Sequence, residues 1–171
     1  MFILIENALA FSFDVSEKDG YYGRTAFHWA CFNGRTDVVK LFMEDVTTFG
    51  IDINSKDKCG STGFHLACKT KLTALVNIFM ANAAKLSINL NVKAKYCITA
   101  FYIACDVGNS DVVKIFMENA AKLSIDLNVR GKHGWTAFHI ACFKGHSDVV
   151  RILMENAAAL SINLNKKSNN G

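Results

Sequence analysis

Three His-x-x-Cys pairs are the residues whose types and spacing most resemble a reactive site. They are His28 with Cys31, His65 with Cys68, and His139 with Cys142. Imidazole nitrogen and thiolate sulfur are ligands that zinc prefers, so one pair alone would suggest half of a metal site. The pairs recur in register, however, and Tyr102 takes the histidine place in one copy while the residues around it keep the pattern. We therefore expect these residues to be structural, with no metal bound.

The remaining candidates for chemistry are equally weak. Cysteines at 31, 68, 105 and 142 form a ladder of equivalent positions. Stacked helices lie about 8–10 Å apart, which is too far for disulfides. Cys59 and Cys97 lie outside this ladder, on expected loops, either as reactive thiols or as plain surface cysteines. The loop at 131–134 lacks the spacing of a phosphate-binding loop. We predict no catalytic residues and no cofactor.

A strict repeat positions all of these residues. Thr25, Thr62, Thr99 and Thr136 are separated by 37 residues, and they begin the words TAFHWACFNG, TGFHLACKTK, TAFYIACDVG and TAFHIACFKG. Each copy runs to an asparagine, at 54, 91, 128 or 165, before the loop that completes the unit. Such self-similarity predicts stacked units with a continuous core. The units we predict are 25–61, 62–98, 99–135 and 136–171, the last including the start of a further loop.

A partial unit, a second helix and its loop, precedes them at residues 1–24. Its segment Ile3 to Ser16 aligns with Ile115 to Asn128, so the chain begins halfway through a repeat. We read the chain as a fragment of a longer array or as a partial gene model.

The unit from Thr99 shows the expected local structure. Thr99 caps a short helix over residues 100–105, and Gly108 ends it because glycine tolerates positive φ. Ser110 is then the expected N-cap of a second helix, whose apolar residues recur at helical spacing. The segment 125–128 alternates apolar and polar residues, which is typical of an extended loop.

These features together resemble the ankyrin repeat: T-x-x-H-x-A at the start, glycine between two helices, and Val-Val in the second helix. The resemblance implies an all-α, ankyrin-type helical solenoid with β-turn finger loops, in which each histidine bonds near its threonine and ties adjacent units. Two departures are the absence of proline and a period of 37 residues against the usual 33. Four extra residues lengthen the second helix or its tail by about 6 Å.

The resemblance also implies that a partner binds a concave face made of the loop tips and the exposed side of each first helix. The residues carried over to that face are Tyr21, Tyr22, Arg24, Phe32, Lys58, Lys69, Lys95, Tyr96, Ile98, Lys132, His133, Trp135, Phe143 and Lys144. Aromatic and basic side chains favour a partner protein with an acidic segment. Our hypothesis takes Tyr96 and Trp135 as anchors. In the alternative interpretation, Phe32 and Phe143 pack against neighbouring loops and the lysines are merely solvated.

Composition bounds the function further. The net charge is +4, from 19 basic and 15 acidic residues, which makes nucleic acid the less favoured partner. No stretch is apolar enough for a membrane span, and six cysteines without an evident signal sequence favour the cytoplasm. We predict an intracellular, non-catalytic protein-interaction scaffold without a small-molecule substrate, monomeric or part of a longer chain. The alternative is the regulatory or substrate-recruiting segment of a larger enzyme, such as a kinase or a ubiquitin ligase.

Overall fold

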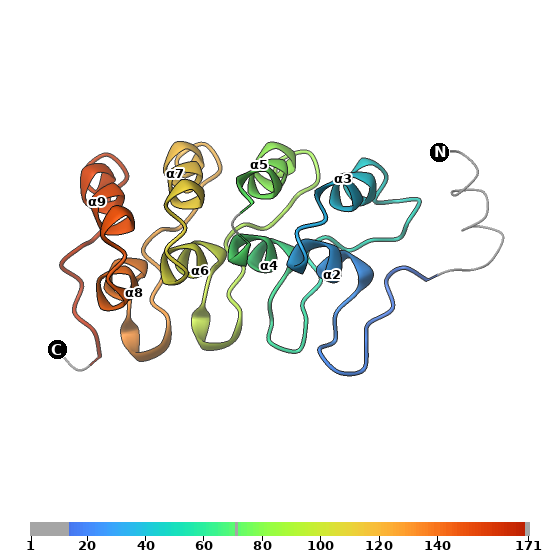
Figure 1. Ribbon diagram of the computed structural model, residues 1–171, viewed down its shortest axis with the longest axis horizontal. Helices are drawn as coiled ribbons and strands as arrows, with labels where there is room; N and C mark the ends of the chain where they lie inside the picture. The colour runs from blue at the N-terminus through green and yellow to red at the C-terminus, as the bar shows by residue number, and fades with distance from the viewer. Residues whose placement is uncertain (1–13, 71, 170–171) are drawn as a thin grey trace.

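The computed structural model describes residues 14–70 and 72–169, and within them the chain forms two rows of antiparallel helices (Figure 1). The first row contains α2 (Ala26–Phe32), α4 (Gly63–Lys69), α6 (Ala100–Asp106) and α8 (Ala137–Lys144). The second contains α3 (Thr36–Glu44), α5 (Thr73–Asn82), α7 (Ser110–Asn119) and α9 (Ser147–Asn156). Each helix packs on its partner within the pair and on the next helix of its own row. The predicted all-α solenoid is confirmed.

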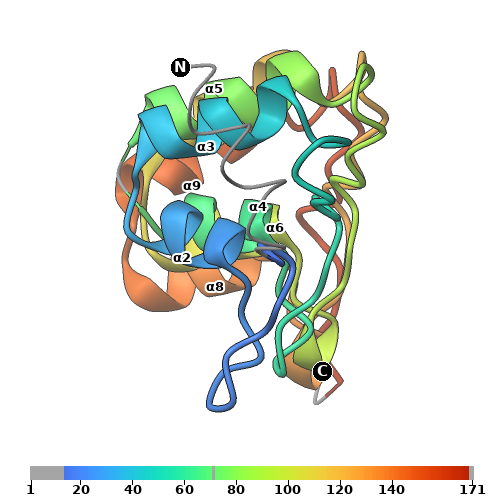
Figure 2. The same ribbon diagram turned by 90° about the vertical axis from the view of Figure 1, so that its right-hand side faces the viewer.

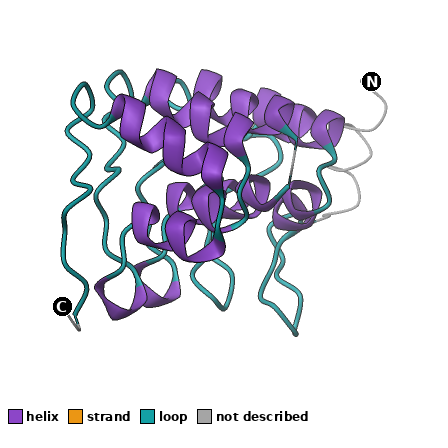
Figure 3. Ribbon diagram, turned by 60° about the vertical axis from the view of Figure 1, so that its left-hand side comes forward, coloured by secondary structure: helices purple, strands orange, loops and turns teal. Residues whose placement is uncertain are grey.

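A loop precedes each helix of the first row and projects away from both rows, as the end-on view shows (Figure 2). We call these loops fingers: finger 1 is residues 17–24, finger 2 is 54–61, finger 3 is 91–98 and finger 4 is 128–135. Fingers 3 and 4 contain short 3-10 turns, η1 (Lys95–Cys97) and η2 (Lys132–Gly134). No strand occurs in the described ranges, where everything outside the helices is loop or turn (Figure 3). We call the fingers and the exposed side of the first row the finger face.

Threonine begins each first-row helix, as predicted. The side chains of Thr25, Thr99 and Thr136 accept a hydrogen bond from the backbone N–H three residues later. This satisfies one of the helix's unpaired amides without proline. The expectation for α7 was wrong by one residue: Asn109, rather than Ser110, is the N-cap and accepts from the Val112 N–H at 3.3 Å. Asparagine caps as well as serine, so the composition of this turn left the choice open.

The core runs without interruption through the stacked units. Phe64 contacts Phe79 and Phe116 at ring-centroid distances of 5.2 and 5.8 Å, and it is 1% exposed. Gly63 lets α4 approach α2 closely, because a Cβ there would lie 2.7 Å from the Phe27 ring. Small residues at such crossings thus set the close spacing of the first row.

Three of the four cysteines in the cysteine ladder belong to this core. Cys31, Cys68 and Cys105 are buried, and burial raises the pKa of each thiol. Cys142, at the same position of the last unit, is exposed. All six cysteines are free thiols. Cys31, Cys68 and Cys105 are unreactive, because burial keeps their thiols protonated.

The extra residues of the long repeat form a turn after each second-row helix. In the third unit the Leu123 N–H still bonds to the Asn119 carbonyl at 2.9 Å, so the helical path continues for about one turn. Ser124 then ends it with φ +50°, and the Ile125 N–H returns to the Ala120 carbonyl at 2.9 Å. This is the pattern of a Schellman cap, with serine where glycine is usual. The predicted longer tail is therefore present.

A ladder of asparagines joins these turns from unit to unit. The Asn91 side-chain amide donates to the Ser124 carbonyl at 2.9 Å, and its oxygen accepts from the Asp126 N–H at 2.8 Å. Asn54 and Asn128 make the same two bonds to the units that follow them. The terminal asparagine of the sequence repeat is thus the polar joint of the stack, which we call the asparagine ladder.

Candidate functional site

His28 and His65, two of the three His-x-x-Cys histidines, join neighbouring units at the base of the fingers. The His28 Nδ1 accepts from the Thr25 backbone N–H at 3.3 Å, so its Nε2 carries the proton that it donates to the Ser55 carbonyl at 2.9 Å. His65 repeats this arrangement with Thr62 and with the Ile98 carbonyl. Burial lowers the pKa of both histidines, which favours the neutral ring.

Both nitrogens of these two rings are therefore engaged by hydrogen bonds within the stack. Among the described residues, no group of three or more His, Cys, Asp or Glu side chains is placed to hold a metal ion.

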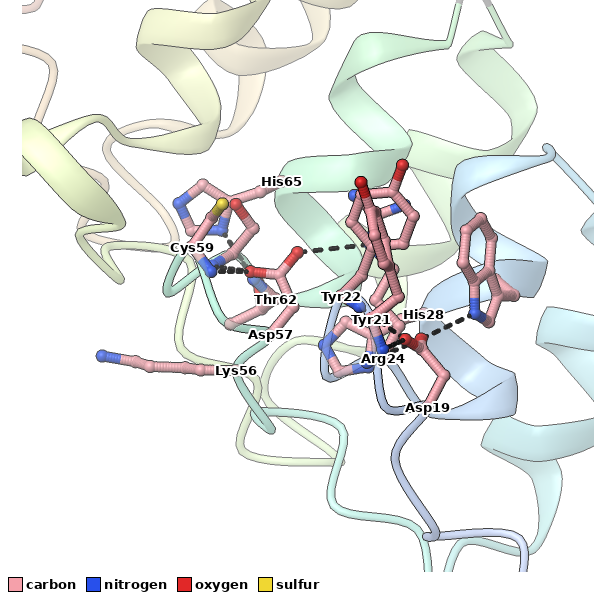
Figure 4. A network of polar contacts seen from close by, with 12 residues as sticks. Asp19, Tyr21, Tyr22, Arg24, His28, Lys56, Asp57, Cys59, Thr62 and His65 are labelled. Atoms are coloured by element: carbon pink, nitrogen blue, oxygen red, sulfur yellow. Dashed lines mark hydrogen bonds and ion pairs between the residues drawn. The ribbon is translucent and has the colours of Figure 1, made fainter.

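Two carboxylates hold the first two fingers in shape (Figure 4). Asp57 accepts from the backbone N–H groups of Cys59 and Ser61 at 2.8 and 2.9 Å. Its second oxygen lies 3.3 Å from the Nε of Arg24, and their side chains are only 2% and 10% exposed. The ion pair therefore joins finger 1 to finger 2 and is shielded from solvent, where loss of one partner is costly.

Asp19 plays the corresponding part in finger 1. Its carboxylate accepts from the backbone N–H groups of Tyr21, Tyr22 and Arg24 and from the Trp29 indole N–H. Burial raises the pKa of Asp19, but these donors outweigh burial and the net shift is downward. The carboxylate stays ionised and keeps the finger closed.

Three aromatic rings surround the Arg24 guanidinium. Its central carbon lies 4.8 Å from the ring centroids of Tyr22 and Trp29 and 4.7 Å from that of Phe32. These are cation–π distances. Arg24 was predicted as a contact residue, but its charged end is covered, and it positions the aromatic rings instead. Sequence reasoning missed Trp29, which occupies a position that is Leu66 in the next unit.

Large apolar side chains are exposed along the finger face. The exposed fraction is 80% for Tyr21, 63% for Tyr96, 70% for Phe143 and 40% for Phe32. Trp135, by contrast, is half-buried, with its ring centroid 5.1 Å from that of Phe143. Burying aromatic side chains such as these against a partner is a common source of affinity.

A pocket lies between finger 2, finger 3 and α6. Its volume is ≈ 300 Å³, and its apolar lining includes Ile98, Tyr102 and Ile103. Lys69 of α4 and Lys95 of finger 3 also line it and are exposed. Tyr102 stands where other units have histidine, and burial raises its pKa, so its phenol is neutral. The pocket is of the size and character that accept an apolar side chain.

The remaining predicted residues lie along the same face. Lys58 directs its ammonium to the Gly20 carbonyl of finger 1, and Lys144 lies 4.0 Å from the Asp106 carboxylate. His133 is exposed at the turn of finger 4, with φ +61°. The Lys132 side chain lies outside the described part of the structure, as do residues 1–13 of the predicted partial unit at 1–24.

The repeated helix pair, the threonine caps and the fingers define an ankyrin-type array, and comparison of the sequence supports this directly. A family model described as ankyrin repeats (3 copies) matches residues 3–94 and 64–167. The chain belongs to the ankyrin-repeat family. No match to the sequence is found among curated proteins. Ankyrin repeats are generally protein–protein interaction modules, and in the described ranges no helix is long and apolar enough to cross a membrane.

Proposed function

We propose that this chain is a non-catalytic scaffold that binds a partner protein on its finger face. The observation that carries the proposal is the concentration of exposed aromatic side chains there, from Tyr21 in finger 1 and Phe32 in the first unit to Phe143 in the fourth. Exposure of each of these rings to water is unfavourable, and burying it against a partner lowers the free energy. The second row exposes fewer large apolar side chains, among them Val38 and Met154.

The charges of the two faces support the same assignment. On the finger face Asp19 and Asp57 are engaged by backbone N–H groups, and Asp106 is paired with Lys144. The lysines around them leave the face positive. The second row mixes both signs, with Asp111 paired to Lys114 at 3.3 Å. A partner with an acidic segment is complementary to the first face and gains little from the second.

The test is quantitative affinity capture from native lysate with the wild-type chain and a Tyr96→Ala/Phe143→Ala variant. Both side chains are mainly exposed, so their truncation leaves the core intact. We expect the captured proteins to fall at least about tenfold in the variant, because aromatic anchors commonly contribute 1 kcal/mol or more each.

Val38→Ala/Met154→Ala is the matched control, since it removes two exposed apolar side chains from the second row. It should retain the partners. If both variants capture the same proteins as the wild-type chain, the finger face is not the binding surface.

A further inference from the structure

The arrangement of pocket, lysines and aromatic rings defines the partner's chemistry more closely. Resting on the function proposed above, we infer that the finger face binds an extended peptide segment. An apolar side chain of that segment enters the pocket beside Tyr102. An acidic side chain about three residues to one side meets Lys69 and Lys95, and a second apolar side chain about three residues to the other side meets Phe143.

The spacing follows from the repeat. Lys69, Asp106 and Phe143 occupy the same position of three successive helices of the first row, so they form a line along the stack. Adjacent packed helices are about 8–10 Å apart. An extended chain advances about 3.3 Å per residue, so about every third residue meets the next unit. A helical segment advances only about 1.5 Å per residue and would need about five to seven residues for the same step.

The partner's acidic side chain is inferred from the lysine charges at the pocket that no carboxylate among the described residues offsets. Asp106 lines the pocket, but Lys144 lies 4.0 Å from it and offsets its charge. Lys69 and Lys95 are exposed, and within the described part of the chain neither forms an ion pair. Two ammonium groups beside an apolar pocket attract a carboxylate on the partner and repel a basic segment.

The apolar side chain is required by the pocket lining. Ile98, Tyr102 and Ile103 present mainly carbon, and the pocket of ≈ 300 Å³ is at the lower end of the range for ligand pockets. It has room for one side chain rather than for a helix. On the next unit, Phe143 is 70% exposed with Trp135 beneath it, which offers a second apolar contact.

The experiment is selection of a random 12-residue peptide library, displayed on phage, against the full 171-residue chain. We expect enriched peptides to carry Asp or Glu about three residues from a large apolar residue, followed at the same spacing by a second apolar residue, in either chain direction. The inference is overturned if the enriched peptides lack acidic residues. It is also overturned if every enriched peptide binds the Phe143→Ala variant as well as it binds the wild-type chain.

A charge swap then checks the contact itself. The best peptide, labelled with a fluorophore, should bind the Lys69→Glu/Lys95→Glu variant at least about tenfold more weakly, by fluorescence polarisation, than the wild-type chain. The same peptide with Asp replaced by Lys should regain affinity for that variant, which an unfolded variant could not do. Equal affinity of both peptides for the variant would exclude the lysine contact. Loss of partners from the Tyr96→Ala/Phe143→Ala variant would still support the proposed function if this inference failed.

Discussion

Fingers 2 and 3 are neighbours of equal length that hold their turns by different means. In finger 2, Asp57 accepts two backbone N–H groups, and Gly60 takes the positive φ of +75°. In finger 3, alanine stands in the place of that carboxylate, and Tyr96 and Cys97 have φ of +61° and +58°. Left-handed backbone costs a non-glycine residue about 1–2 kcal/mol. Finger 2, on one side of the pocket, therefore has its turn N–H groups hydrogen-bonded to a carboxylate, whereas the backbone of finger 3, on the other side, is strained.

The difference separates a turn held by a carboxylate, in finger 2, from a turn with strained backbone, in finger 3. Strain of this kind persists only where the surrounding structure imposes it, and it is often found at functional sites. Here it places Tyr96 at the turn of finger 3, beside the pocket, with 63% of its surface exposed. Finger 2 supplies the rigid support on the other side.

The largest expected effect comes from removing the support of finger 2. Asp57→Ala should lower the free energy of unfolding by about 3–5 kcal/mol, because it leaves the covered Arg24 guanidinium unpaired. Asp57→Asn should cost less, since an amide oxygen can still accept from the two N–H groups. Urea denaturation measures both. A loss below about 1 kcal/mol for the alanine variant would show that the carboxylate does not support the finger.

A smaller loss is expected from imposing on finger 2 the strain of finger 3. Gly60→Ala should cost about 1–2 kcal/mol, since alanine resists left-handed backbone, and its Cβ would lie 3.3 Å from the Cα of Ala94. Gly20→Ala is the control, because it has open space and no positive φ. If the two variants unfold at the same urea concentration, backbone strain does not distinguish the fingers.

The reverse change should relieve finger 3. Cys97→Gly is expected to raise the free energy of unfolding by up to about 1 kcal/mol, offset in part by the greater freedom of glycine in the unfolded chain. Cys97→Ser keeps the Cβ and removes only the thiol, so it should bring no gain. Thermal unfolding of both variants makes the comparison, and an equal gain would assign the effect to the thiol.

The smallest effect is a dependence of stability on pH through His28 and His65. Burial lowers their pKa from 6.5, so below that pH the unfolded chain binds more protons than the folded one. Stability is therefore present above pH 6.5 and declines as the pH falls. The decline should be modest, because the bonds to Ser55 and Ile98 and the charge of Asp57 oppose it. The His28→Gln/His65→Gln variant should show a flatter profile in urea denaturation at successive pH values.

Most of the fold could be predicted because one pattern is written four times. The period predicted the helix pairs, the threonine caps and the bonds made by His28 and His65, and it gave the apparent zinc ligands a structural interpretation. The N-cap of α7 was misassigned because Asn109 and Ser110 are both good caps, and only the backbone path selects between them.

The site was harder to predict because it depends on what differs between copies. Repeat position alone assigned Arg24 to the concave binding face, yet its guanidinium is covered by rings that include Trp29. The repeat pattern gives no sign that Trp29 has this role. A basic residue flanked in sequence by Tyr22 and Trp29 was the available signal. The pocket could not be predicted from the sequence, because it forms where finger 2, finger 3 and α6 meet.

The asparagine ladder also acts as a gauge of unit length. Each of its side chains reaches a carbonyl 33 residues ahead and an N–H 35 residues ahead. Inserting or deleting one residue between them would shift both partners at once, whereas removing a whole 37-residue block would bring equivalent partners back into place. Such an array tolerates change in its length in whole units, so duplication and loss of complete repeats are the changes its joints accept.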